Sequence, residues 1–132
     1  MASIRKEVLL DAPIETVWAA LRDVGALHTR LVPGFVIDCR MDGDARVVTF
    51  ANGMEARELI VDVSDSERRV VWASVGGKLT HHNASAQVFA EGSGQSRLVW
   101  IADLLPNELT EVIATMIEQG LAAMKRAFAT SA

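Results

Sequence analysis

Apolar residues recur at helical spacing between residues 11 and 23. They occupy positions i, i+3, i+4 and i+7, at Ile14, Val17, Trp18 and Leu21, which places them on one face of a helix. Asp11 precedes this segment and is a suitable N-cap, because its side chain can accept a hydrogen bond from a free backbone amide of the first turn. We therefore predict an amphipathic helix that starts after Asp11 and ends at Gly25, followed by a short second helix over residues 26–31.

Residues 35–103 are typical of an antiparallel meander. Extended apolar runs alternate with short turn-forming segments, at residues 42–44, 52–53, 64–66, 76–77 and 92–94. This spacing matches consecutive β-hairpins. With residues 3–10 as a further strand before the first helix, the chain is predicted to have about seven strands.

The longest periodic segment spans residues 107–129. Its apolar stripe is wide and contains Leu109, Val112, Ile113, Met116, Ile117, Leu121, Met124 and Phe128. A helix with such a stripe needs a large apolar surface to pack against. The antiparallel sheet offers that surface, so the sequence predicts a single α+β domain over residues 1–132 in which the sheet wraps around a long C-terminal helix.

Composition narrows the class of protein. Half of the 132 residues are hydrophobic and 23% are charged, which is typical of a globular domain with a packed core. Cys39 is the single cysteine, so no internal disulfide is expected. The net charge is −4 and no basic run exceeds a dipeptide, which argues against a nucleic-acid partner. Neither a secretory signal nor a long apolar run is evident, so we expect a cytoplasmic protein without membrane insertion.

Four segments in order give the chain a family resemblance. APIETVWAALRDVGALH (12–28), GDARVVTFANG (43–53), ARELIVDVSDSERRVVW (56–72) and EQGLAAMKRAF (118–128) resemble the START and polyketide cyclase-like (SRPBCC) superfamily. The resemblance covers nearly the whole chain and implies the helix-grip fold, with a cavity between the sheet and the C-terminal helix. It implies a polyketide cyclase/dehydrase-like protein. No nucleotide cofactor is implied, and no cofactor is expected.

His82 is a candidate for the polar chemistry of this cavity. On a strand over residues 79–90, alternation puts it on the same face as small residues, Ala84 and Ala86, which leaves room for a ligand. The other interpretation is a surface histidine at a hairpin end. His81 points the opposite way, so the two histidines are a poor metal pair, and no metal site is expected.

Arg57 and Glu58 are neighbours, so alternation turns one of them inward. Apolar periodicity groups Arg57 on a buried face with Leu59, Val61 and Val63. The resemblance instead implies that Glu58 faces the cavity together with Met54, Ala56 and Ile60. One β-bulge would reconcile the two patterns. We favour Glu58 inside, where it would need a cation or a proton; a solvated ion pair along the strand is the alternative.

Aromatic and helical positions complete the predicted site. Tryptophans on strands suit either an apolar cavity wall or ordinary core packing. Gly120 costs roughly 1 kcal/mol relative to alanine within a helix, which indicates room for a ligand or for close approach of a strand; the resemblance implies that it borders the cavity with two other helical positions. The predicted ligand-binding residues are Phe50, Met54, Glu58, Trp72, His82, Trp100, Val112, Met116 and Gly120.

Three functions fit these features. The first is binding of a small, largely hydrophobic molecule. The second is a polyketide cyclase/dehydrase or aromatase in which His82 or Glu58 moves a proton and Arg57 or Trp100 orients the substrate. The third is an interaction protein: if Glu58 points inward, alternation turns the apolar residues of its strand outward, and such a face favours a homodimer. These residues are Leu59, Val61 and Val63.

Overall fold

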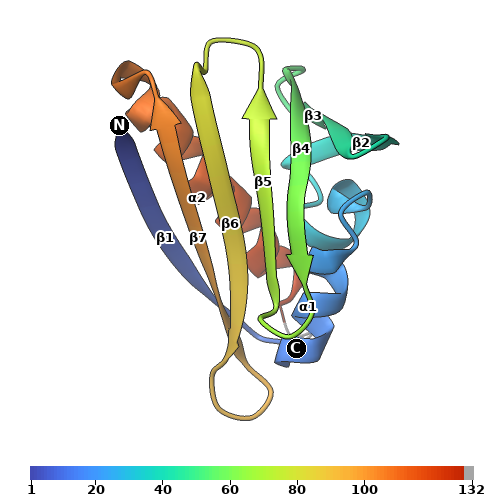
Figure 1. The fold of residues 1–132 in the computed structure, drawn as a ribbon. Helices are drawn as coiled ribbons and strands as arrows, with labels where there is room; N and C mark the ends of the chain where they lie inside the picture. The colour runs from blue at the N-terminus through green and yellow to red at the C-terminus, as the bar shows by residue number, and fades with distance from the viewer. Residues whose placement is uncertain (130–132) are drawn as a thin grey trace.

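A seven-stranded antiparallel sheet with one long helix across its inner face forms the structure (Figure 1), a computed structural model that describes residues 1–129. The strands are β1 (Ala2–Leu10), β2 (Val36–Asp42), β3 (Ala45–Phe50), β4 (Glu55–Ser64), β5 (Arg69–Val75), β6 (His81–Ala90) and β7 (Ser96–Leu105). The helical segments are α1 (Ile14–Arg22), the short π-helical turn η1 (Leu27–Leu31), the 3-10 turn η2 (Asn107–Leu109) and α2 (Thr110–Ala127).

The strand order is β1-β7-β6-β5-β4-β3-β2. From β2 to β7, each strand pairs with the next one along the chain, and β1 closes the order beside β7. The two short helical segments connect the two edge strands, β1 and β2. The predicted α+β fold, with a sheet around a C-terminal helix, is confirmed.

The start of α1 differs from the prediction. Pro13, not Asp11, occupies the N-cap position, and its carbonyl accepts the first helical hydrogen bonds from Thr16 and Val17. The extended conformation of Pro13 delays the helix by two residues. Asp11 instead accepts a hydrogen bond from Gln95 Nε2 at 2.8 Å, which ties the chain before α1 to the β6–β7 turn. The predicted Asp11 cap is therefore wrong.

Helix α2 packs its apolar stripe against the sheet. Its buried residues are Ile117, Gly120, Leu121, Ala123 and Met124, and they join a core formed with the inward-facing residues of the strands. Cross-strand partners on this inner face include Leu98 opposite Val88 and Ala102 opposite Ala84, all of them buried. Within residues 1–129, no helix has the length and apolarity that crossing a membrane requires.

Strand β4 contains one β-bulge, but it does not reconcile the two predicted patterns. Arg57, Leu59 and Val61 are exposed, so the buried face that apolar periodicity indicated for them is wrong. Ile60 pairs with Trp72, but the next pair is Asp62 with Val71, so Val61 is the extra residue. Before the bulge, Glu58 is buried, which confirms the prediction that it points inward. After the bulge, Val63 pairs with the buried Val70. Val63 is exposed, as are Leu59 and Val61, but the bulge takes it out of the outward register that begins with Leu59, so the prediction of one continuous face is wrong at this residue.

Candidate functional site

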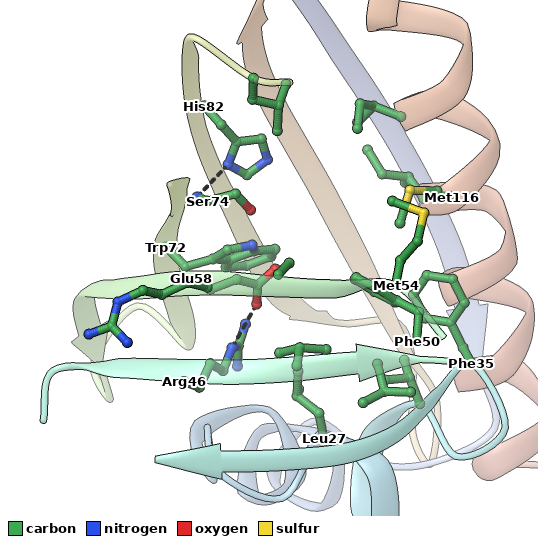
Figure 2. Close-up of a pocket in the computed structure, with 18 of the residues that line it drawn as sticks. Leu27, Phe35, Arg46, Phe50, Met54, Glu58, Trp72, Ser74, His82 and Met116 are labelled. Atoms are coloured by element: carbon green, nitrogen blue, oxygen red, sulfur yellow. Dashed lines mark hydrogen bonds and ion pairs between the residues drawn. The ribbon is translucent and has the colours of Figure 1, made fainter. Parts of the chain in front are cut away.

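A cavity of about 580 Å³ lies between the inner face of the sheet and α2 (Figure 2). Strands β3 to β7, η1 and α2 contribute its lining. The structure places eight of the predicted ligand-binding residues on its wall: Phe50, Met54, Glu58, Trp72, His82, Trp100, Val112 and Met116. Their contact with a ligand stays a prediction.

Gly120 is the predicted residue that does not line the cavity. A Cβ atom at this position would lie 2.9 Å from Cζ3 of Trp100 and 3.3 Å from Cε2 of Phe35. The glycine thus lets α2 approach the indole of Trp100 closely. Of the two explanations that its sequence position allowed, the structure supports close packing against a strand.

The cavity has a polar wall and an apolar wall (Figure 2). His82, Ser74, Trp72 and Glu58 lie along the sheet side, and Met54, Phe50, Phe35 and Met116 lie across from them. The rings of Phe35 and Phe50 contact each other edge to face, with centroids 5.3 Å apart. Among these labelled residues, the polar side chains lie along the sheet side.

Glu58 forms a buried ion pair with Arg46. Arg46 Nε donates to Glu58 Oε1 at 2.8 Å, and the two side chains are 4% and 11% exposed. The residues are direct cross-strand partners on β3 and β4. Arg46 Nη1 also donates to the carbonyl of Val24 at 3.1 Å. An isolated buried charge is costly, so Arg46 is the cation that the buried glutamate requires.

Arg46 was not among the predicted site residues, although it lines the cavity. Its guanidinium also lies over the Trp72 ring, 5.4 Å from the centroid. The signal for it was the register of the hairpin: the turn at residues 51–53, closed by the hydrogen bond from the Phe50 amide to the Met54 carbonyl, places residue 46 opposite residue 58. Once Glu58 is taken as inward, its partner on β3 must also be inward.

Arg57 reaches the cavity lining, but its charged end lies at the surface. Its Nη1 donates to Asp42 Oδ2 at 2.7 Å. The hydrogen bond and charge of Arg57 hold the pKa of Asp42 below its usual value. The guanidinium of Arg57 is thus engaged outside the cavity.

His82 is half-buried at the end of the polar wall, whereas His81 is exposed. Its Nδ1 accepts a hydrogen bond from the backbone amide of Ser74 at 2.9 Å. Burial, and secondarily the charge of His81, lower the pKa of His82, which favours the neutral ring. Because Nδ1 is the acceptor, the single ring proton is on Nε2.

The two cavity tryptophans contact each other edge to face, with ring centroids 5.7 Å apart. The Nε1 atom of Trp100 is buried and has no hydrogen-bond partner within residues 1–129. Buried polar groups are normally paired. The indole N–H of Trp100 is therefore an unsatisfied donor in a residue of the cavity wall.

The described residues support neither of two further kinds of chemistry, a reactive cysteine or a bound metal ion. Cys39 is buried, and burial is the main cause that raises the pKa of its thiol, so the reactive thiolate is disfavoured. In the described part of the chain, no three His, Cys, Asp or Glu side chains gather in a way that could hold a metal ion.

Comparisons with known proteins agree with this architecture. A putative uncharacterized protein from Bacillus thuringiensis has 18% identity and a TM-score of 0.87, with 98% of this chain and 100% of that chain covered. The di-domain ARO/CYC BexL from the BE-7585A biosynthetic pathway has 14% identity and a TM-score of 0.82, over 96% of this chain and 46% of that chain. Truncated norcoclaurine synthase from Thalictrum flavum has 19% identity and a TM-score of 0.71, over 96% and 90%.

These similarities, all below 25% identity, show the fold. Among curated proteins, the chain has no match. The family model described as polyketide cyclase / dehydrase and lipid transport matches residues 1–129. The chain therefore belongs to the polyketide cyclase/dehydrase and lipid transport family.

Proposed function

We propose that this protein binds a small, largely apolar molecule in the cavity between the sheet and α2. The observation that carries the proposal is the cavity itself: about 580 Å³ of space, partly open to solvent and lined mainly by aromatic and aliphatic side chains. Small-molecule sites typically have this size and composition. The polar groups along the sheet side would fix the orientation of the ligand.

The enzymatic alternative uses His82 or Glu58 for proton transfer. General acid–base catalysis needs an atom that is free to exchange a proton with the substrate. Arg46 holds Oε1 of Glu58, and the Ser74 amide holds Nδ1 of His82. With Nδ1 engaged and the ring proton on Nε2, the neutral His82 ring has no free nitrogen that could accept a proton, which favours a binding role for His82 over a role as general base.

The first experiment is native mass spectrometry of gently purified protein, followed by denaturing extraction of any bound molecule. A co-purifying apolar molecule of a size that fits the cavity supports the proposal. The same spectra report the oligomeric state. Incubating the extracted molecule with fresh protein distinguishes binding from chemistry, because an enzyme would convert it or its precursor.

A matched pair of variants tests whether the cavity is the binding site. Val112 lines the cavity on α2 and Val61 does not; the two are similarly exposed, at 56% and 59%. Val112→Glu places a charge at the cavity and keeps the first turn of α2 favourable for an acidic residue. We expect it to weaken binding of the neutral fluorescent probe N-phenyl-1-naphthylamine about tenfold, while Val61→Glu leaves binding unchanged. Equal effects, or no probe binding by the native protein, would contradict the proposal.

A further inference from the structure

The orientation of His82 is set by the backbone of the neighbouring strand. Pairing between β5 and β6 ends at Trp72 and Ala84, so the amide of Ser74 lies beyond the last paired residue. The ring of His82 takes the place of a strand partner, with Nδ1 2.9 Å from the Ser74 nitrogen. An unpaired amide in this half-buried position would be costly, which holds the ring in this orientation.

The second nitrogen of the ring is turned away from Ser74 and faces the cavity (Figure 2). Among residues 1–129, the one hydrogen bond of the ring is at Nδ1. Since a neutral imidazole carries one proton, and Nδ1 acts as acceptor, Nε2 carries that proton. Turning the ring over to offer an acceptor instead would break the bond to Ser74.

The carboxylate of Glu58 on the polar wall is already compensated by the charge of Arg46. Arg46 and Glu58 bind each other, and Arg46 also binds the Val24 carbonyl. His82 therefore offers the cavity a fixed donor that is not committed to another side chain. A molecule that covers this N–H without accepting its hydrogen bond would displace the water that solvates it and leave the donor unpaired, which weakens binding.

We propose that His82 determines ligand specificity by donating an Nε2–H hydrogen bond, so that the cavity selects apolar molecules bearing an oxygen acceptor, such as a carbonyl, over hydrocarbons of the same shape. This inference rests on the proposed binding function and names the class of ligand. It also assigns His82 the role of donor and not of general base.

The test compares two rigid molecules of nearly the same shape, fluorene and 9-fluorenone, which differ in the carbonyl oxygen. Their affinities are measured by displacement of N-phenyl-1-naphthylamine. One added hydrogen bond predicts that fluorenone binds about three- to tenfold more tightly than fluorene. His82→Leu is expected to abolish this preference. His81→Leu, which changes the exposed neighbour, is the matched control and should retain it.

The outcomes separate this inference from the function on which it rests. If fluorene and fluorenone bind equally well, or if His82→Leu keeps the preference, the specificity role is wrong while the binding function stands. If the native protein binds neither these molecules nor the probe, the binding function fails and the inference fails with it.

A measurement on the native protein covers the case in which His82→Leu does not fold. Long-range ¹H–¹⁵N correlation spectra distinguish the two neutral forms of histidine. We expect the form with the proton on Nε2, and a change in the Nε2 shift when fluorenone is added but a smaller one with fluorene. A proton on Nδ1 would overturn the proposal.

Discussion

Arg57 and Glu58 are neighbours on β4, yet their ion pairs lie in opposite surroundings. Glu58 meets Arg46 on the inner face, where the side chains are 11% and 4% exposed. Arg57 meets Asp42 at the surface, where they are 44% and 65% exposed. The two pairs have nearly the same length, 2.8 Å and 2.7 Å. Burial, and not the geometry of the contact, should therefore decide how much stability is lost when one partner of each pair is removed.

The largest effect is expected from removing the buried cation. Arg46→Met leaves the carboxylate of Glu58 in the cavity wall without a partner, and breaking a buried pair in this way costs about 3–5 kcal/mol. Urea denaturation monitored by tryptophan fluorescence measures the free energy of unfolding. A loss below about 1 kcal/mol would show that Glu58 is solvated through the cavity and that the pair resembles a surface one.

Removing both charges sharpens the same comparison. Arg46→Met combined with Glu58→Leu leaves no unpaired charge, and such replacements are often neutral. We expect the double variant to recover most of the stability that Arg46→Met loses, in a double-mutant cycle of unfolding free energies. Additive losses would contradict the interpretation, since they would mean that the two side chains do not depend on each other.

The next effect comes from His82, the other polar group of the inner face. Its pKa is lowered in the folded protein, so the unfolded chain takes up a proton first as the pH falls below its ordinary value of 6.5. The stability that neutral His82 contributes is therefore present above pH 6.5 and is lost as the pH falls, with a slope of at most about 1.4 kcal/mol per pH unit.

Comparing the pH dependence of unfolding in the native protein and in His82→Leu isolates this contribution from the other titrating groups. The native protein should lose more stability than the variant between pH 7 and pH 5, a range chosen to span about one unit or more on the acid side of an ordinary histidine pKa. Parallel curves would mean that folding does not change the proton affinity of His82.

Features that depend on residues close together in the sequence could be predicted, whereas features that depend on contacts between distant residues could not. The turns and the alternation of apolar residues are local, so the strands and α2 could be predicted from the sequence. The inward orientation of Glu58 was implied by the family resemblance and does not depend on the bulge, which follows it at Val61. Arg46 could not be identified from its own strand, because buried residues flank it on both faces at Ala45 and Val48; only the register of the hairpin identifies it.

Contacts between diverging strands were still harder to predict. The Ser74 amide binds His82 because the β5–β6 pairing stops two residues earlier, and no local pattern marks where two strands separate. The start of α1 shows a similar limit, because Asp11 and Pro13 are both acceptable residues at the beginning of a helix. The choice depends on Gln95, which lies far along the chain and holds Asp11.

The smallest effect should come from the surface pair, and it completes the comparison. Arg57→Ala removes the partner of Asp42, but water can solvate the carboxylate that remains, so unfolding free energy should change by no more than about 0.5–1 kcal/mol. The local effect is on titration: without Arg57, whose hydrogen bond and charge hold the pKa of Asp42 down, that pKa should rise toward the ordinary value of 3.8. An NMR titration of the Asp42 side chain measures the shift directly, with Asp44, next to the same β2–β3 turn, as an internal reference. If Arg57→Ala destabilised the protein as strongly as Arg46→Met, charge pairing along β4 would matter irrespective of burial, and the distinction between its inner and outer faces would fail.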